Sequence, residues 1–134
     1  MPLIRSKDIR TITHLAGGEI SSEEEVALEA ILGFQGYSEG TLVDHKISES
    51  MSMGDCVFEP GAVVPTHHHD DVEEMFYVFE GNGTAVVDGE EHGMSIGDVL
   101  LVPRGSHHSF RNESGRPWRM VFAYSSLNIS TVFD

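Results

Sequence analysis

Three consecutive histidines, His67 to His69, constrain this chain more than any other feature of its sequence. They lie within Gly61–Gly81, where a cluster of acids and then an apolar run ending at a glycine follow them. Side chains alternate between the two faces of an extended strand. His67 and His69 therefore share a face, roughly 6.6 Å apart along the chain, and His68 points to the other face. Two imidazoles on one face can converge on a divalent metal ion, together with a carboxylate from a neighbouring strand.

Further candidate ligands follow along the chain. Glu73 and Glu74 can each supply the carboxylate, although alternation makes them face opposite ways. His107 and His108 stand just inside a later strand and offer a further imidazole. The residues alone therefore predict a metal site and leave open which carboxylate and which later histidine complete it.

At these positions the sequence resembles the cupins. The first cupin motif, G-x5-H-x-H-x(3,4)-E-x6-G, is met by Gly61, His67, His69, Glu74 and Gly81. The second motif, G-x5-P-x-G-x2-H-x3-N, is met by Gly97, Pro103, Gly105, His108 and Asn112. Residues 82–96 separate the two motifs, a spacing that is similar to that of compact microbial single-domain cupins.

This resemblance implies an all-β fold, an antiparallel cupin-type β-barrel (double-stranded β-helix or jelly roll). It also implies the metal ligands His67, His69, Glu74 and His108. We interpret His68 and His107 as bystanders on the outer face of the barrel. Asn112 lies too far along its strand to be a ligand, so we expect its side chain to hold the following turn by hydrogen bonds. Cupins are functionally diverse, so the fold and metal site follow more strongly than any reaction.

The pattern of apolar residues predicts where the elements of such a barrel lie. We expect a short helix at 23–32, outside the barrel, because Ser22 and Glu25 fit a capping box. Strands are expected at 41–47, at 53–58 before a turn at 59–61, from Glu74 to Gly81, on both sides of an Asp88-Gly89 hairpin, as a buried apolar strand at 99–102, and at 118–124. The chain is then one domain, with an arm and helix at 1–40, the barrel at 41–125 and a tail at 126–134.

Composition restricts the partners and the compartment. A formal net charge of −14 argues against nucleic acid, because phosphate contacts need Lys and Arg. Four arginines between residues 104 and 119 are either ordinary surface groups or a positive patch for an anionic substrate. Cys56 is the only cysteine, so an internal disulfide is impossible, and we expect a small buried residue there. No signal peptide or membrane span is recognised, so we expect a cytoplasmic protein that contacts no membrane. We also expect a homodimer that acts on a small molecule.

The ligand set bears on the chemistry. Three histidines and one glutamate around an octahedral ion leave two open positions, which suits Fe, Mn, Ni or Co, while Zn stays possible. We expect one such ion per chain and an enzyme that acts on a small oxygenated molecule. Oxygen-dependent (dioxygenase-like) chemistry and redox-neutral lyase, isomerase or decarboxylase chemistry both stay open, as does a non-catalytic binding or sensing role. In the redox-neutral reactions, Glu74 or Tyr124 would transfer a proton to or from the substrate. An aromatic and methionine stripe is either plain core or the substrate pocket, formed by Phe110, Met120, Phe122 and Tyr124.

Overall fold

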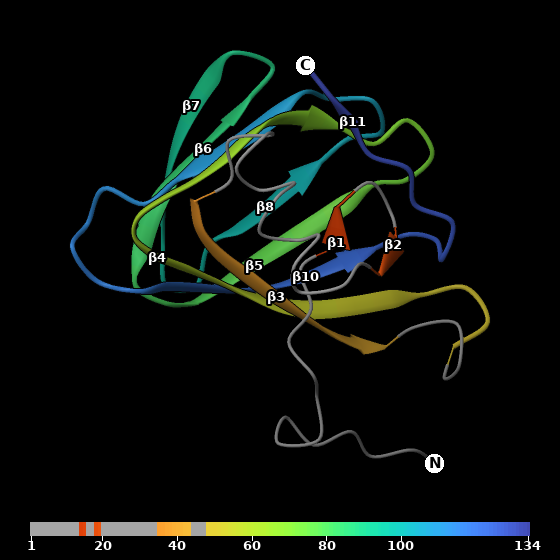
Figure 1. The fold of residues 1–134 in the computed structure, drawn as a ribbon, viewed down its shortest axis with the longest axis horizontal. Helices are drawn as coiled ribbons and strands as arrows, with labels where there is room; N and C mark the ends of the chain where they lie inside the picture. Colours follow the sequence, from red (N-terminus) through yellow and green to blue (C-terminus); the bar gives the residue numbers. More distant parts are fainter. Residues whose placement is uncertain (1–13, 16–17, 20–34, 44–47) are drawn as a thin grey trace.

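A computed structural model describes residues 14–15, 18–19, 35–43 and 48–134, and all of the regular elements in these ranges are β-strands (Figure 1). In chain order they are β1 (His14–Leu15), β2 (Gly18–Glu19), β3 (Gln35–Val43), β4 (Ser52–His68), β5 (Glu74–Glu80), β6 (Asn82–Val87), β7 (Glu90–Ser95), β8 (Val99–Val102), β9 (His108–Arg111), β10 (Trp118–Tyr124) and β11 (Val132–Phe133). The helix expected at 23–32 lies outside the described residues.

Nine of these strands form one antiparallel sheet that curls into a barrel (Figure 1). Seven strands follow the order β7-β6-β9-β4-β10-β5-β8, and both β3 and β11 also pair with β4. Strands β1 and β2 form a separate two-stranded sheet. The predicted antiparallel barrel is confirmed. The expected division of the chain at residues 40 and 125 stays a prediction, although β3 begins at Gln35 and β11 lies beyond residue 125.

Strand β4 differs from the sequence-based expectation, because it continues through the expected turn at 59–61. It pairs with β10 as far as Phe58 and with β9 from Val63 onward. Gly61 lies between these two segments with a φ of 85°, and its N–H donates to the Asn112 carbonyl at 2.8 Å. A φ in this range favours glycine. The turn residues therefore bend one strand between two partners and do not end it.

Two smaller expectations have opposite outcomes. The hairpin is confirmed, because Asp88 and Gly89 both have positive φ and join β6 to β7. The expectation of a fully buried strand at 99–102 is wrong, since Val99 and Leu101 are 62% and 50% exposed. Strand β8 is at one end of the strand order, and only its alternate residues face the core. Because residues 99–102 are all apolar, their sequence gives no sign of which side chains face the core and which face solvent.

The hydrophobic core fills the barrel and includes a group of packed aromatic rings. Phe58 and Trp118 lie in neighbouring strands with ring centroids 4.7 Å apart, and Phe110 packs against both rings. Gly83 allows the Trp118 ring to approach closely, because a β-carbon at Gly83 would lie 2.1 Å from it. Cys56 is buried with a free thiol, as expected. These rings form a rigid base next to the histidines.

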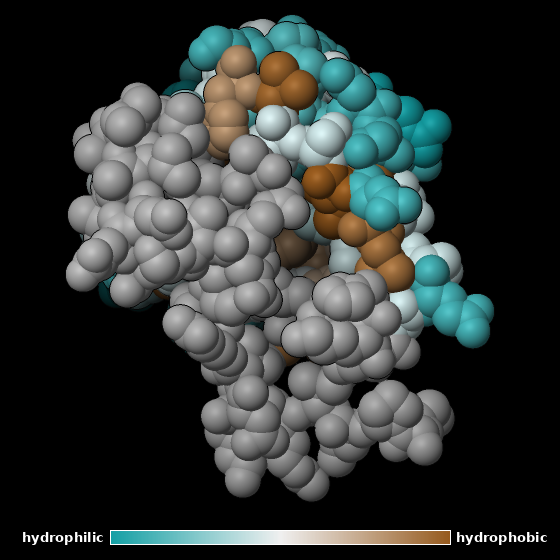
Figure 2. Space-filling model, turned by 45° about the vertical axis from the view of Figure 1, so that its right-hand side comes forward, coloured by the Kyte–Doolittle hydropathy of each residue, from teal (hydrophilic) through white to brown (hydrophobic). Residues whose placement is uncertain are grey.

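On the face in Figure 2, the coloured surface is mainly hydrophilic, with smaller hydrophobic areas. Arg111 is bound to Glu91 and Glu113, at 2.8 and 2.9 Å, and Arg119 lies 4.0 Å from Glu80. Two of the four arginines are therefore paired with acids on the protein itself. Within the described ranges, we find no helix that is long and apolar enough to cross a membrane.

Candidate metal centre

Strands β4 and β9 bring three histidines together. His67, near the end of β4, is opposite His108, the first residue of β9, and His69 follows β4 directly. The centroids of the three rings lie 4.2 to 5.3 Å apart, and one ligand atom from each residue lies within 4.8 Å of the others. All three side chains are buried, with exposed fractions of 8%, 5% and 0% for His67, His69 and His108. Period-two alternation thus places these residues as the sequence predicted.

A carboxylate lies beside two of these rings. Glu74 begins β5, is 4% exposed, and has its Oε1 3.6 Å from His69 Nε2 and 3.5 Å from His108 Nε2. Glu73 is exposed, and its backbone N–H donates to Ser125 Oγ. The structure therefore brings Glu74 to the histidines and leaves Glu73 outside.

Each of the three rings is held from behind by a backbone carbonyl. The Nδ1 atoms of His67, His69 and His108 lie 2.8, 2.8 and 3.0 Å from the carbonyl oxygens of Pro65, Ser130 and Ser106. A carbonyl only accepts, so each Nδ1 carries the proton and each Nε2 keeps its lone pair. Metal-bound histidines are commonly oriented in this way.

The Nε2 atoms provide the test of whether a metal fits. His69 Nε2 and His108 Nε2 are buried and have no hydrogen-bond partner among the described residues. With the proton on Nδ1, these atoms cannot donate to Glu74, and lone pairs facing a carboxylate repel it. A divalent cation between them would satisfy both nitrogens and the carboxylate. The residues therefore fit a metal ion.

The charges of His67 and Glu74 agree with this fit. Burial, together with the neighbouring His108, lowers the pKa of His67 to about 3, so this imidazole is neutral at physiological pH. Burial opposes ionisation of Glu74, but interactions with His108 and then His69 outweigh burial and lower its pKa to about 2. These interactions require a proton on Nε2, and a bound ion would replace that positive charge. Burial lowers the pKa of His69, but its interaction with Glu74 outweighs burial and raises it, so a metal ion would have to displace a proton from this ring. Neutral imidazole and ionised carboxylate are the forms that bind metals.

Aromatic side chains surround the histidines. The ring of Tyr124 meets His69 edge-on at 5.4 Å, and Phe110 meets His108 edge-on at 5.8 Å. Phe122 packs against Tyr124 at 5.6 Å, whereas Met120 is fully buried opposite Cys56 in the core. Of the four residues expected in a pocket, Phe110 and Tyr124 contact the histidines, Phe122 is one ring further away, and Met120 belongs to the core.

Sequence reasoning missed residues of β3 and of the C-terminal segment. Glu39 is a buried carboxylate that accepts a 2.6 Å hydrogen bond from the Tyr37 hydroxyl. Burial and then Glu74 and Glu39 raise the pKa of Tyr124 well above its usual value, so Glu39 acts on the same region. Phe133 packs on His67 at 5.6 Å. Tyr37 and Glu39 are two residues apart and share one face of β3, and this spacing is a sequence signal that could have identified the pair.

Asn112 has the structural role expected of it. Its amide group donates to the carbonyls of Phe58 and Arg116, and its Oδ1 accepts hydrogen bonds from the backbone and the hydroxyl of Ser114. The side chain is 1% exposed. It fixes the turn between β9 and β10 and thereby the course of the strand that carries His108.

Comparison with known proteins places this site in context. A family model described as a cupin domain matches residues 54–124. Gentisate 1,2 dioxygenase 1 of Aquipseudomonas alcaligenes is 35% identical over 89 residues, covering 66% of this chain and 25% of that protein. The tetracenomycin polyketide synthase protein TcmJ of Streptomyces glaucescens is 33% identical over 75 residues, covering 56% of this chain and 50% of that protein. The chain thus spans a quarter to a half of the length of these two curated relatives.

Solved structures also share the fold of this chain. The polyketide cyclase RemF from Streptomyces resistomycificus matches 100% of this chain and 87% of that chain, with a TM-score of 0.76. The sequence identity is 19%, so this likeness concerns the architecture alone.

Proposed function

Since this chain belongs to the cupin family, we propose that it is a metal-dependent enzyme that acts on a small oxygenated molecule. One observation carries the proposal: the buried, unpartnered Nε2 atoms of His69 and His108 face the carboxylate of Glu74. His67, His69, His108 and Glu74 would hold one divalent ion per chain. Three neutral imidazoles and one carboxylate leave that site with a formal charge of +1.

The four ligands favour Fe²⁺, Mn²⁺, Ni²⁺ or Co²⁺ over Zn²⁺, because an octahedral ion keeps two open positions. When bound, such an ion supplies Lewis acidity and, for iron, a site for oxygen chemistry. The low pKa of Glu74 favours the role of ligand over that of a base. The raised pKa of Tyr124 keeps its hydroxyl protonated, so that it can donate a hydrogen bond to a substrate oxygen.

Oxygen-dependent, dioxygenase-like chemistry is the first candidate reaction. Identity of 35% over 89 residues to a gentisate dioxygenase supports it. The aromatic side chains of Phe110 and Phe122, next to His108 and Tyr124, also support it, because an apolar surround excludes water from reactive intermediates.

Redox-neutral chemistry is the second candidate, and the protonated tyrosines favour it. Burial and then Glu39 raise the pKa of Tyr37, and Tyr124 is similarly shifted by burial and by Glu74. A protonated hydroxyl beside a cationic centre can stabilise the oxyanion that forms in a lyase, isomerase or decarboxylase reaction. In that case Tyr124 contacts the substrate oxygen and Glu74 stays with the ion.

A screen of small oxygenated substrates, in air and under argon, would test the proposal. The protein would be stripped of metal and reconstituted with each candidate ion in turn. Turnover in air alone indicates oxygen chemistry, and equal turnover in both atmospheres indicates a redox-neutral reaction. Tight binding of a small molecule without turnover would overturn the enzymatic proposal in favour of a binding module. The expected homodimer stays a prediction, which light scattering would test.

A further inference from the structure

The outer face of the two histidine strands carries a second cluster of metal-ligand side chains. We propose that His68, His107 and Asp134 bind a second divalent transition-metal ion, outside the barrel. One ligand atom from each of these residues lies within 4.8 Å of the other two. The ring centroids of His68 and His107 are 4.4 Å apart, with 36° between the ring planes. The cluster is separate from the buried histidines, because His68 and His107 are the sequence neighbours of inward-facing residues and point to the opposite side of the sheet.

The second cluster follows from the pairing of the strands. His67 and His108 are directly opposite one another and face inward. Their neighbours in sequence, His68 and His107, are therefore brought together on the other side of the sheet. Strand β11 pairs with His67 and His68, and this register carries Asp134 to the same place, where its N–H donates to the Thr66 carbonyl at 3.2 Å.

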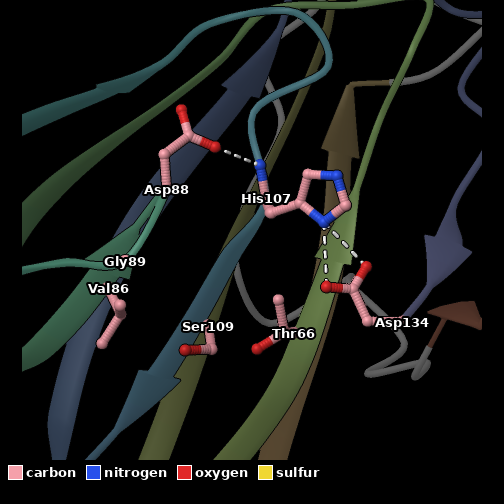
Figure 3. Close-up of a pocket in the computed structure, with 7 residues that line it drawn as sticks. All are labelled: Thr66, Val86, Asp88, Gly89, His107, Ser109 and Asp134. Carbon is pink, nitrogen blue, oxygen red and sulfur yellow. Dashed lines mark hydrogen bonds and ion pairs between the residues drawn. The ribbon is translucent and has the colours of Figure 1, made fainter.

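Hydrogen bonds prepare these side chains for an ion. His68 Nδ1 donates to Asp70 Oδ1 at 2.8 Å, which leaves the lone pair on Nε2. A carboxylate behind the ring is a usual partner of a metal-binding histidine. The Asp134 carboxylate lies 2.8 Å from His107 Nδ1 through either oxygen (Figure 3). Two ligands in adjacent positions on one ion are roughly 3 Å apart for bonds of about 2.1 Å, so this spacing needs little adjustment.

A cleft next to the cluster has room for the remaining ligands. It has a volume of about 480 Å³ and is lined by His107, Asp134, Thr66, Ser109 and Asp88, among others. Figure 3 shows the carboxylate of Asp134 beside the His107 ring and the hydroxyls of Thr66 and Ser109 further along the cleft. Three protein ligands with water in the remaining positions form an open site. Two nitrogens and one oxygen suit Zn²⁺, Ni²⁺, Co²⁺ or Cu²⁺ better than Mg²⁺ or Ca²⁺.

The charge around the cluster also favours a cation. Residues 48–103 contain no Lys or Arg, and Asp70 and Asp88 both bond to residues of the cluster. The side chains of His107 and Asp134 are 48% and 42% exposed, so an ion can enter from solvent. Their exposure also predicts weaker binding than at the buried histidines, because water screens the attraction.

An outer ion would fasten the C-terminal segment to the barrel. This segment supplies Asp134 to the outer cluster and the Ser130 carbonyl to His69 of the inner one. Phe133, between them, packs on His67. The outer ion would therefore hold in place two groups that contact the buried histidines.

Zn²⁺ titration of the metal-free full chain, purified without a polyhistidine tag, would test this proposal. Calorimetry should give two ions per parent chain. His107→Gln and Asp134→Asn should keep the first ion and bind the second at least about 10-fold more weakly. His69→Ala should show the reverse, weakening the first ion and keeping the second. His92→Gln, a histidine on β7 outside both clusters, is the matched control and should still bind two.

The outcomes separate the two sites. Glutamine at 107 can still donate to Asp134, so a lost second ion in His107→Gln reports on metal ligation and not on that bond. Circular dichroism checks folding, and if His107→Gln does not fold, Asp134→Asn alone decides. The proposal is overturned if the parent binds only one ion, if both outer variants keep two, or if the His92→Gln control loses the second ion as well. Failure of the enzymatic proposal would leave these results unchanged.

Discussion

The inner and outer histidines occupy the same two strands, yet their surroundings are opposite. The rings of His67, His69 and His108 are buried and bonded to backbone carbonyls. The rings of His68 and His107 are 16% and 48% exposed and are bonded to the carboxylates of Asp70 and Asp134. A shift of one residue along a strand is enough to change the solvent, the partner and the charge around the same side chain.

This contrast shows how one strand pair can produce sites of different strength. Backbone carbonyls have less freedom to rotate than side-chain carboxylates, so the inner rings are held in one orientation before any ion arrives. Carboxylates on flexible side chains, in contact with water, can rotate away or exchange partners. The inner site should therefore bind its ion tightly and release it slowly, and the outer site should exchange its ion with solvent. Four measurements test this difference between the inner and outer sites.

The largest effect is expected from removing an inner ligand. His69→Ala or His108→Ala should reduce the affinity for the inner ion by more than roughly 100-fold, because such a change exceeds the loss of a supporting contact. His68→Ala should leave the inner ion in place. The measurement is metal per chain by elemental analysis after gel filtration, which removes the exchangeable outer ion. Loss of the retained ion in His68→Ala, with retention in His69→Ala, would show that the strand phase is wrong.

Removal of the inner ion should lower the stability of the fold. An ion held by the four proposed ligands would join β4, β5 and β9. It would therefore bind the folded state and add about 2.7 kcal/mol to the free energy of unfolding at a hundredfold excess over its Kd. Chelation should lower the Tm of protein that has been shown to carry metal. If chelation lowers the Tm of His107→Gln by the same amount, the effect belongs to the inner site, because this variant is expected to have a weakened outer site. Superimposable melting curves with and without chelator would contradict a structural contribution.

A smaller effect is expected at the carboxylate. Glu74→Gln keeps the size of the side chain but removes its charge, so the inner ion should bind roughly 10- to 100-fold more weakly. Glu73→Gln is the matched control, since Glu73 is exposed and directed away. Calorimetric titration of both variants gives the comparison. The opposite pattern, with Glu73→Gln weakened and Glu74→Gln unchanged, would identify Glu73 as the ligand.

The smallest effect is expected behind the outer ring. Asp70→Asn removes the charge that orients His68, and the outer ion should bind about 10-fold more weakly, with the inner ion unaffected. Two-site titration with Zn²⁺ measures both constants on one sample. An equal decrease in affinity at the two sites would mean that they are coupled, although they lie on opposite sides of the same strands.

Local patterns predicted much of the barrel and of the inner cluster. Period-two alternation distinguished His67 and His69 from His68, and the Asp88-Gly89 pair marked its hairpin. Alternation failed at residues 99–102, where an apolar run hid an exposed face. Turn residues at 59–61 were misread, because Gly61 bends β4 without ending it.

Contacts between distant residues could not be predicted in this way. Ser130 is 61 residues from His69, and Asp134 is 27 residues from His107, so nothing local connects them. The position of Glu39 likewise depends on the pairing of β3 with β4, which puts Glu39 opposite Cys56. Pairing of strands that are far apart in sequence decides these contacts, and side-chain patterns within one strand carry no record of it.

The bonds behind the inner rings have a consequence for variation among related sequences. Their acceptors are the main-chain oxygens of Pro65, Ser106 and Ser130, and every amino acid has such an oxygen. These three positions can therefore change their side chains without altering which nitrogen of each imidazole holds the proton. A survey of invariant residues would pass over them, although they set the chemistry of the site as firmly as the histidines themselves.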